Sequence, residues 1–394
     1  MHAGVNSSSY QQAARDLAEL SDLTVTAKQV ERLTHRVGQE RVDQRDAAVA
    51  AFRDRPLMGQ DTIADPGRPC PPVAMVSVDG GRLQVRSPAR SGSSPRAGHW
   101  RESKVAVLET YQSTASATDP DPDVPRCFLD VTHTAQLVRG LGHALPTGLE
   151  GPEAQAGPDP PTEADRARRP GRPQRLVRSA LASRACADDF GPMMHQAAWE
   201  RNFFGAHRRA FLGDGQAANW TIQRRHFPSF EAILDFVHAL SYVFAAALAG
   251  RRRSEGAAVY TRWIQAVWAG QVESILPELE ARSAELGVPP PECPDSDPRE
   301  LVLEALRYLR NNAERMRYDE YRRAGLPIMT SAVESMIKQI NRRAKGSEKF
   351  WSEPGAEAIL QLRADSLSET EPLARFWKQR EQEAPWHRPY RRAG

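Results

Sequence analysis

The clearest alternation of apolar and polar positions lies between Leu326 and Trp351. Apolar residues recur there at helical spacing and predict a helix with one narrow buried face. These residues are Val333, Met336, Ile337, Ile340 and Ala344. A second stripe runs along the edge of that face and begins with a carboxylate that cationic and amide groups follow turn by turn. Its members are Glu334, Lys338, Asn341 and Lys345.

Two interpretations of Glu334 are open at this point. A carboxylate near the start of a helix, followed by cations, is the arrangement that an enzyme needs to hold a metal ion beside a phosphate backbone. The same glutamate completes a Ser331-x-x-Glu334 capping box. In a capping box the glutamate only closes the first turn of the helix.

Residues 1–55 show a helical pattern with one short break. The first segment places Ala13, Ala14, Leu17 and Leu20 on one face, and Thr26-x-x-Gln29 starts a second segment that carries Val30, Leu33 and Val37. Two short helices around a tight turn suit a helix-turn-helix, with Lys28 and Arg32, beside Gln29 and Arg36, available to DNA on the second helix. A helical hairpin used for packing or dimerisation fits the same spacing.

After a Pro/Gly-rich linker at 56–72, the period of the pattern changes to two. The segment VAMVSVD predicts a strand that ends at Asp79, Gly80-Gly81 predicts a hairpin turn, and LQVR predicts a strand that pairs back. KVAVLETY predicts the next strand, so we expect three antiparallel strands in a row. Asp79 is either a turn residue, because Asp-Gly favours hairpins, or a ligand.

The middle of the chain continues the first part of a predicted core at 73–250. Residues 143–175 are rich in Pro, Gly, Ala and charge without periodicity, and predict a disordered surface loop. A helix from about Asp188 to Arg208 follows. Ala210 to Leu212 predicts a buried strand with Asp214 at its C-terminal end, where carboxylates act as ligands or as helix caps.

The most apolar run, from Ile233 to Gly250, contains Asp235 and His238. It is too short to predict a membrane span, and the N-terminus lacks a signal-peptide pattern. The four cysteines are widely spaced and predict reduced thiols. We therefore expect a cytoplasmic protein with no membrane partner. The net charge of +3 gives no global field for a nucleic acid, so local basic patches matter more.

The last part of the chain is predicted to be helical throughout. Residues 251–300, which prolines interrupt, predict a helical insertion, and residues 301–367 predict the second part of the core. LVLEALRYLRNNAERMRYDEYRRAG predicts one helix whose arginines interleave with Tyr308, Tyr318 and Tyr321, which favours a surface that follows phosphates. GAEAILQLRADSL predicts a further helix, and residues 368–394 form a basic tail that we expect to fray.

Three acids now occur in the order strand, strand, helix: Asp79, Asp214 and Glu334. Carboxylates brought together repel each other unless cations neutralise them, and Mg²⁺ prefers such hard oxygen ligands. Five segments of the chain resemble bacterial insertion-sequence transposases of the DDE superfamily. They are VSVDGGRLQVR, WRESKVAVLETY, RRAFLGDGQAANWTIQRRHFPSFEAILDFVHAL, YLRNNAERMRYDEYRRAGLPI and SAVESMIKQINRRAKGSEKFW. The resemblance covers about residues 10–367.

The resemblance implies an α/β fold: a ribonuclease-H-like mixed sheet with flanking helices, a helical insertion and an N-terminal helix-turn-helix-like region. It implies that Asp79, Asp214 and Glu334 are catalytic and hold two Mg²⁺ ions, for which Mn²⁺ can substitute. Asp235 and His238 match a motif near that site to which we assign no role. The implied partner is DNA, bound by a homodimer or larger assembly associated with the nucleoid.

The expected reaction is metal-dependent cleavage at the element ends, followed by transfer of the freed 3′-hydroxyl into target DNA. We expect Lys338, Arg342, Arg343 and Lys345 to lie along the DNA backbone. Two alternatives remain: a catalytically inactive DNA-binding remnant of a transposase, and a metal-dependent nuclease of the same fold that cuts without joining.

Overall fold

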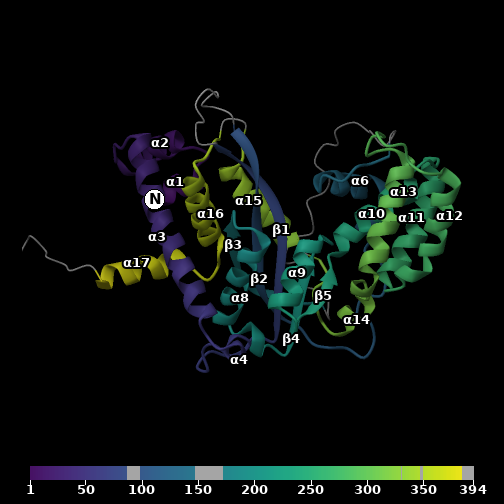
Figure 1. Ribbon diagram of the computed structural model, residues 1–394, viewed down its shortest axis with the longest axis horizontal. Helices are drawn as coiled ribbons and strands as arrows, with labels where there is room; N and C mark the ends of the chain where they lie inside the picture. The colour runs from purple at the N-terminus through teal and green to yellow at the C-terminus, as the bar shows by residue number, and fades with distance from the viewer. Residues whose placement is uncertain (87–97, 147–171, 330, 347–348, 384–394) are drawn as a thin grey trace, which may run out of the picture.

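A mixed five-stranded sheet with helices on both faces forms the centre of the molecule (Figure 1). The computed structural model describes residues 1–86, 98–146, 172–329, 331–346 and 349–383. The strand order is β3-β2-β1-β4-β5, in which β2 is antiparallel to β1 and β3, whereas β1, β4 and β5 are parallel. The strands are β1 (Val73–Arg86), β2 (Gly98–Gln112), β3 (Gln174–Ser183), β4 (Arg208–Gly213) and β5 (Glu231–Leu234).

The predicted hairpin at Gly80-Gly81 is wrong, because β1 continues through both glycines. Gly80 pairs with Lys104 and Gly81 with Ser103 in an unbroken antiparallel register with β2. The connection between β1 and β2 falls in residues 87–97, outside the described residues. The three predicted strands are therefore only two, β1 and β2, and the third antiparallel strand of the sheet is β3.

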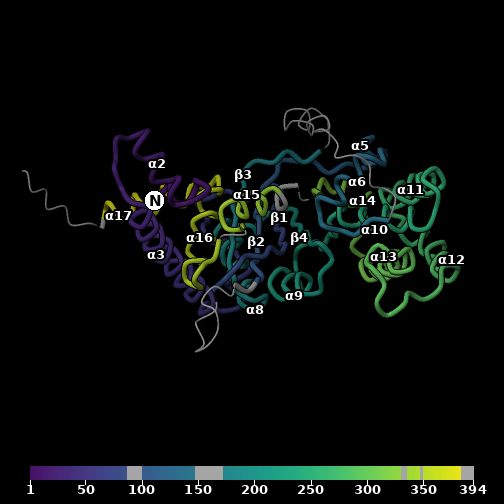
Figure 2. The backbone as a smooth tube through the Cα atoms, turned by 90° about the horizontal axis from the view of Figure 1, so that it is seen from above, coloured from purple at the N-terminus to yellow at the C-terminus, as the bar shows by residue number. Residues whose placement is uncertain are grey.

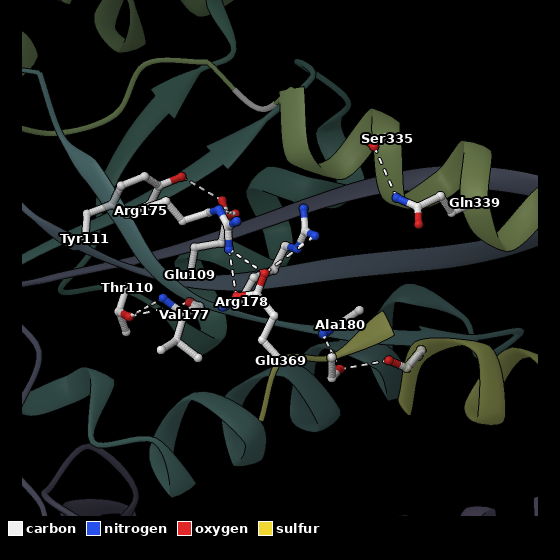
Figure 3. Close-up of polar contacts among 12 residues, drawn as sticks. Glu109, Thr110, Tyr111, Arg175, Val177, Arg178, Ala180, Ser335, Gln339 and Glu369 are labelled. Atoms are coloured by element: carbon white, nitrogen blue, oxygen red, sulfur yellow. Dashed lines mark hydrogen bonds and ion pairs between the residues drawn. The ribbon is translucent and has the colours of Figure 1, made fainter. Parts of the chain in front are cut away.

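Strand β3 was not predicted, and its first residues fall in the range expected to be a disordered loop. Most of that range, 147–171, lies outside the described residues. The outer edge of β3 is covered by the segment after α16 (Glu353–Leu367) (Figure 3). Ala180 N donates to Ser368 Oγ at 2.9 Å, and Arg178 N donates to Glu369 Oε2 at 2.8 Å. Side-chain acceptors thus satisfy donors that an edge strand otherwise leaves open.

Alternate residues of β2 contribute to two separate hydrophobic clusters on the two faces of the sheet. Ala106 and Leu108 belong to the larger cluster, and Val105 and Val107 belong to the smaller one. The helices of the larger cluster are α5 (Arg126–Leu129), α6 (Val131–Gly140), α8 (Ala187–Glu200), α9 (Ala217–His226), α10 (Phe236–Leu248), α11 (Arg253–Trp268), α12 (Leu276–Leu286), α13 (Pro298–Asn312) and α14 (Tyr318–Arg323).

Helices α10 to α14 gather in a helical lobe beside β5 (Figure 1). This lobe includes the predicted helical insertion. The single helix predicted around Tyr308 to Arg323 is instead divided into α13 and α14. Tyr318 and Tyr321 are buried rather than aligned on a phosphate-tracking surface, and the Tyr318 hydroxyl donates to the carbonyl of Leu234 at 3.0 Å. The aromatic residues of this segment therefore anchor it to β5.

Helices α15 (Ser331–Ala344) and α16 cover the other face of the sheet, and the N-terminal helices pack on the outer side of α16 (Figure 2). The N-terminal helices are α1 (His2–Asn6), α2 (Tyr10–Ser21) and α3 (Ala27–Arg53). The capping box predicted at Thr26 is confirmed, but the second helix is 27 residues long rather than short. Along α3, Gly38 approaches Ala358 of α16 so closely that an added Cβ would lie 2.6 Å from the Cβ of Ala358. Val5 and Val37 share the smaller cluster with Met336 and Ile359.

Residues 56–72, predicted as a linker, contain the short helix α4 (Leu57–Gln60) and are held against the core. The side chain of Asn202 accepts from the N–H groups of Ala64 and Asp65 and donates to the carbonyls of Asp65 and Arg68. The predicted basic tail begins with helix α17 (Pro372–Glu383), and residues 384–394 lie outside the described residues. Within the described ranges, no helix is long and apolar enough to cross a membrane.

Candidate active site

Three aspartates follow directly on paired residues of three neighbouring parallel strands. Val78 of β1 pairs with Gly213 of β4, and Gly213 pairs with Leu234 of β5. Asp79, Asp214 and Asp235 come next in each strand. Neighbouring strands lie about 4.8 Å apart, so the register places the three residues in a row across the sheet, with Asp214 in the middle. In Figure 1, β5 is the strand on the side of the sheet toward the helical lobe.

The electrostatics of Asp79 show that these groups act on one another. Its carboxylate is partly buried, and its Oδ1 accepts from the N–H of Gly80 at 2.5 Å. Burial first, and then the negative charge of Asp214, raise the pKa of Asp79 to about 6. Asp235 contributes in the same direction, while His238 opposes the shift. A bound cation would favour the ionised form of the Asp79 carboxylate and so oppose this shift.

Asp214 is held by its own turn and by a helix of the lobe. Its Oδ1 accepts from Gln216 N at 3.0 Å and from Asn219 Nδ2 at 2.8 Å. Its main-chain carbonyl accepts from the Tyr308 hydroxyl at 2.6 Å. Gly215 has φ +98° and lies against the Tyr308 ring, where a Cβ would come within 2.5 Å of a ring carbon. The N-cap of α9 is Gln216, so Asp214 does not cap that helix.

Asp235 has a structural explanation, which the sequence left open. Only 2% of the residue is exposed, and its Oδ1 accepts from Val237 N at 2.8 Å as the N-cap of α10. His238 lies one turn further along α10. Its ring centroid is 5.7 Å from that of His143, which follows α6. His238 therefore belongs to a cluster beside the acids rather than to an isolated core position.

The structure adds an aromatic cluster at the site that sequence reasoning did not identify. The His143 ring lies edge-on to the Tyr242 ring, with 4.9 Å between the ring centroids. The Tyr242 ring stacks on that of Tyr308, with 3.7 Å between the centroids. Burial lowers the pKa of His143 to about 4, with a smaller contribution from His238. These residues come from three separate elements and share no local motif. Their association with Asp214 arises only from the tertiary fold.

Glu334 lies in α15, but its side chain is outside the described residues, so its predicted place in the triad stays a prediction. The helix itself lies over β1 and β2. Asn341 Oδ1 is 3.8 Å from the position that a Cβ on Gly81 would take. The C-terminal end of α15 is fixed by Trp351, whose Nε1 donates to the carbonyl of Ala344 at 2.8 Å while its backbone bridges to Val85.

The basic residues of α15 divide into exposed and buried groups. Lys338, Arg342 and Lys345 are exposed. Arg343, which we expected along the DNA backbone, is only 4% exposed; its Nε donates to the carbonyl of Gly4 at 3.0 Å. Its guanidinium lies 4.4 Å from the Tyr10 ring centroid. That expectation is corrected: the guanidinium of Arg343 is packed inside the protein and does not face a phosphate.

Two DNA-binding residues predicted in the N-terminal region lie on the open side of α3. Lys28 and Arg32 are exposed, and Lys28 pairs with Glu31 of the same helix at 2.9 Å. The opposite side of α3 is occupied, because Arg41 and Arg45 form ion pairs with Asp365 and Glu357 of α16. The exposed face is compatible with binding to a partner, and its contact with DNA stays a prediction.

Asp79 and Asp214 carry the type of oxygen donor that a hard divalent cation prefers. Burial, and then the negative charge of Asp214, raise the pKa of Asp79, and a bound cation would oppose both effects. Among the residues that the structure describes, no group of three or more His, Cys, Asp or Glu side chains is arranged to hold a metal. The Glu334 carboxylate is not among the described side chains.

Comparison with known protein families and curated proteins found no match. The chain matches no protein-family model, and no curated protein is similar to it in sequence.

Proposed function

We propose that this chain is a DNA transposase of the DDE type with a ribonuclease-H-like catalytic core. The observation that carries the proposal is the pairing of Val78 with Gly213, which places Asp79 and Asp214 side by side on adjacent strands. Burial, together with the negative charge of Asp214, raises the pKa of Asp79 to about 6. A mixed five-stranded sheet with α15 lying over β1 is compatible with such a core.

In this proposal Asp79, Asp214 and Glu334 hold two Mg²⁺ ions. When bound, such a pair of ions supplies activation of the attacking hydroxyl and stabilisation of the leaving oxygen. The protein keeps the aspartates in position through hydrogen bonds to their oxygens. Gly80 N–H orients Asp79, while Asn219 Nδ2 orients Asp214 and Tyr308 fixes the turn that carries it.

The basic face of α15 binds the substrate in the proposed complex. Lys338, Arg342 and Lys345 are exposed on the helix that carries Glu334, so a DNA strand lying along them is led to the acids. Contacts to phosphates position a strand without reading its sequence. In this proposal the N-terminal helices recognise the DNA sequence at the element end, and Lys28 and Arg32 are exposed there.

The proposal is tested with linear DNA that carries the sequences flanking the coding region, incubated with the full-length protein and Mg²⁺. We expect strand cleavage at the element ends and joining to a supercoiled plasmid, and loss of both reactions in Asp79→Asn and Asp214→Asn with DNA binding retained. Cleavage by the Asn variants in Mg²⁺ would contradict the mechanism. Cutting without joining by the wild type would assign the chain to the nucleases instead.

A further inference from the structure

The strands β1 and β2 extend beyond the sheet as a two-stranded ribbon. Strand β4 pairs with β1 only as far as Val78, and β3 pairs with β2 only from Lys104. Residues 81–86 of β1 pair with residues 98–103 of β2 beyond these points. The ribbon therefore starts at Gly81, two residues after Asp79, and leads away from the candidate active site.

The two faces of the ribbon differ in character because successive side chains of a strand point to opposite sides. Leu83 and Val85 are buried in the smaller hydrophobic cluster, against α15 and α16. Arg82 and Arg86 alternate with them and are exposed. Trp100 pairs with Gln84, between the two arginines, and 48% of it is exposed. An exposed indole between two cations is unusual on a surface that only has to stay soluble.

Helix α15 adds further positive charge to this surface. Lys345 Nζ lies 5.5 Å from the centroid of the Trp100 ring, and Arg342 is exposed on the same helix. Glu102 is the acidic residue on this side of the ribbon, and its carboxylate is paired with Lys104 Nζ at 2.7 Å. The surface therefore combines an aromatic face with a local excess of cations.

We propose that this surface, formed by Arg82, Arg86, Trp100 and Lys345, binds single-stranded DNA next to the candidate active site. Trp100 stacks on an unpaired base, and the cations contact the flanking phosphates. A base inside a duplex is stacked on its neighbours and offers no free face, so the chemistry favours a single strand. The inference rests on the proposed function for the choice of DNA as the partner.

The position of the surface suits a strand that has one end at the acids. Gln84, the partner of Trp100, is five residues beyond Asp79 in β1. At the rise of a β-strand this separation is roughly 17 Å. A strand held at Trp100 thus reaches Asp79 within a few nucleotides.

The stacking contact is tested by titrating the full-length protein, in EDTA, into a fluorescein-labelled 20-nucleotide oligothymidylate and following anisotropy. Trp100→Ala is expected to weaken binding about tenfold, and Trp100→Phe, which keeps a ring, is expected to stay within about threefold of wild type. Val288→Ala is the matched control, because Val288 is an exposed apolar residue remote from the ribbon. It is expected to bind like the wild type.

The charged contacts are tested by the salt dependence of the same binding. The double variant Arg82→Gln, Arg86→Gln removes two phosphate contacts and should lower the slope of log K against log salt by about 1.4. Trp100→Ala should leave the slope unchanged. Arg252→Gln with Arg253→Gln removes the same charge from the helical lobe, at exposed positions, and should leave both affinity and slope unchanged.

Oligothymidylate binding by Trp100→Ala within twofold of wild type would overturn the inference. So would an equal loss in the binding of a blunt duplex, since stacking requires an unpaired base. The binding assay needs no metal, so its result can contradict the single-strand surface without bearing on the proposed cleavage reaction. If Trp100→Ala loses binding but the wild type shows no Mg²⁺-dependent cleavage, the proposed transposase function is rejected. The proposal that this surface binds single-stranded DNA is then retained.

Discussion

At Asp79, burial and the charge of Asp214 both favour the protonated carboxyl and raise its pKa to about 6. An aspartate in the unfolded chain has a pKa near 3.9. At pH values between these two pKa values, the Asp79 carboxyl is therefore protonated to a greater extent in the folded chain than in the unfolded chain. The stability that the proton contributes is fully present below about pH 4 and is lost as the pH rises through 6.

The variant Asp79→Asn should therefore stabilise the protein at pH 7 in the absence of divalent cations, by about 2 kcal/mol, and much less at pH 4. Urea unfolding followed by circular dichroism at the two pH values measures the difference. Mg²⁺ should stabilise the wild type more than the variant, because the variant lacks one charged ligand. An Asn variant that is less stable than wild type at pH 7 would contradict this account of the site.

Substitutions of the neighbouring arginines Arg342 and Arg343 in α15 are predicted to have different effects on stability and on DNA binding. Arg343→Ala removes a buried guanidinium that contacts Gly4 and Tyr10, and should cost about 3 kcal/mol of unfolding free energy. Arg342→Ala changes an exposed residue and should stay within about 0.5 kcal/mol, while lowering the salt slope of DNA binding by about one. Equal destabilisation by both substitutions would argue against the packing of Arg343.

The sequence contained the information needed to place Arg343. It falls three residues after Ile340 and seven after Met336, on the same helical face as those buried residues. Charge type suggested DNA contact, whereas spacing indicated burial. Asp79 and Asp214 could be found because each follows an apolar strand. The positions of His143 and Tyr242 could not be found, because they depend on how α6 and α10 pack.

Among the secondary-structure elements, β1 shows most clearly how local signals can mislead. Gly80-Gly81 after an aspartate is typical of a hairpin turn, but pairing with β2 extends the strand through both residues. Strand β3 was missed for a related reason. Its exposed and buried residues do not alternate regularly, and its strand conformation is imposed by β2 and by the segment at Ser368. Neither pairing can be read from local sequence.

Two glycines near the site should respond differently to alanine. Gly80→Ala is expected to change stability by less than about 1 kcal/mol, because the residue is in extended strand and a Cβ would have 3.6 Å to the nearest atom. Gly215→Ala should cost more than about 2 kcal/mol, since φ is +98° and a Cβ would collide with Tyr308. Chemical denaturation compares the two, and a large loss in Gly80→Ala would support a turn at that position instead.

At the scale of the whole molecule, the N-terminal helices are packed into the same structure as the candidate catalytic helix. Val5 and Val37 share a hydrophobic cluster with Met336 of α15, and Arg343 reaches back to Gly4. The predicted separation of residues 1–55 from the core followed from the Pro/Gly-rich segment at 56–72. Sequence composition predicted a boundary there, but it could not show that α3 lies along α16.

Removal of residues 1–55 should therefore expose the smaller hydrophobic cluster and prevent cooperative folding of the remainder. A fragment that starts at Pro56 is expected to bind a hydrophobic dye and to lack the unfolding transition of the full chain. Calorimetry and dye fluorescence measure these properties. A fragment with a sharp transition near that of the full chain would show that the N-terminal helices are an independent domain.

The central claim is that Asp79 and Asp214, at matching positions of two adjacent strands, hold divalent cations. Crystals of the full-length protein soaked in Mn²⁺ and measured at the manganese absorption edge test it most directly. We predict an anomalous peak about 2.2 Å from a carboxylate oxygen of each aspartate, absent in Asp79→Asn. A soak that shows manganese elsewhere on the protein, with no peak between these two side chains, would contradict the claim.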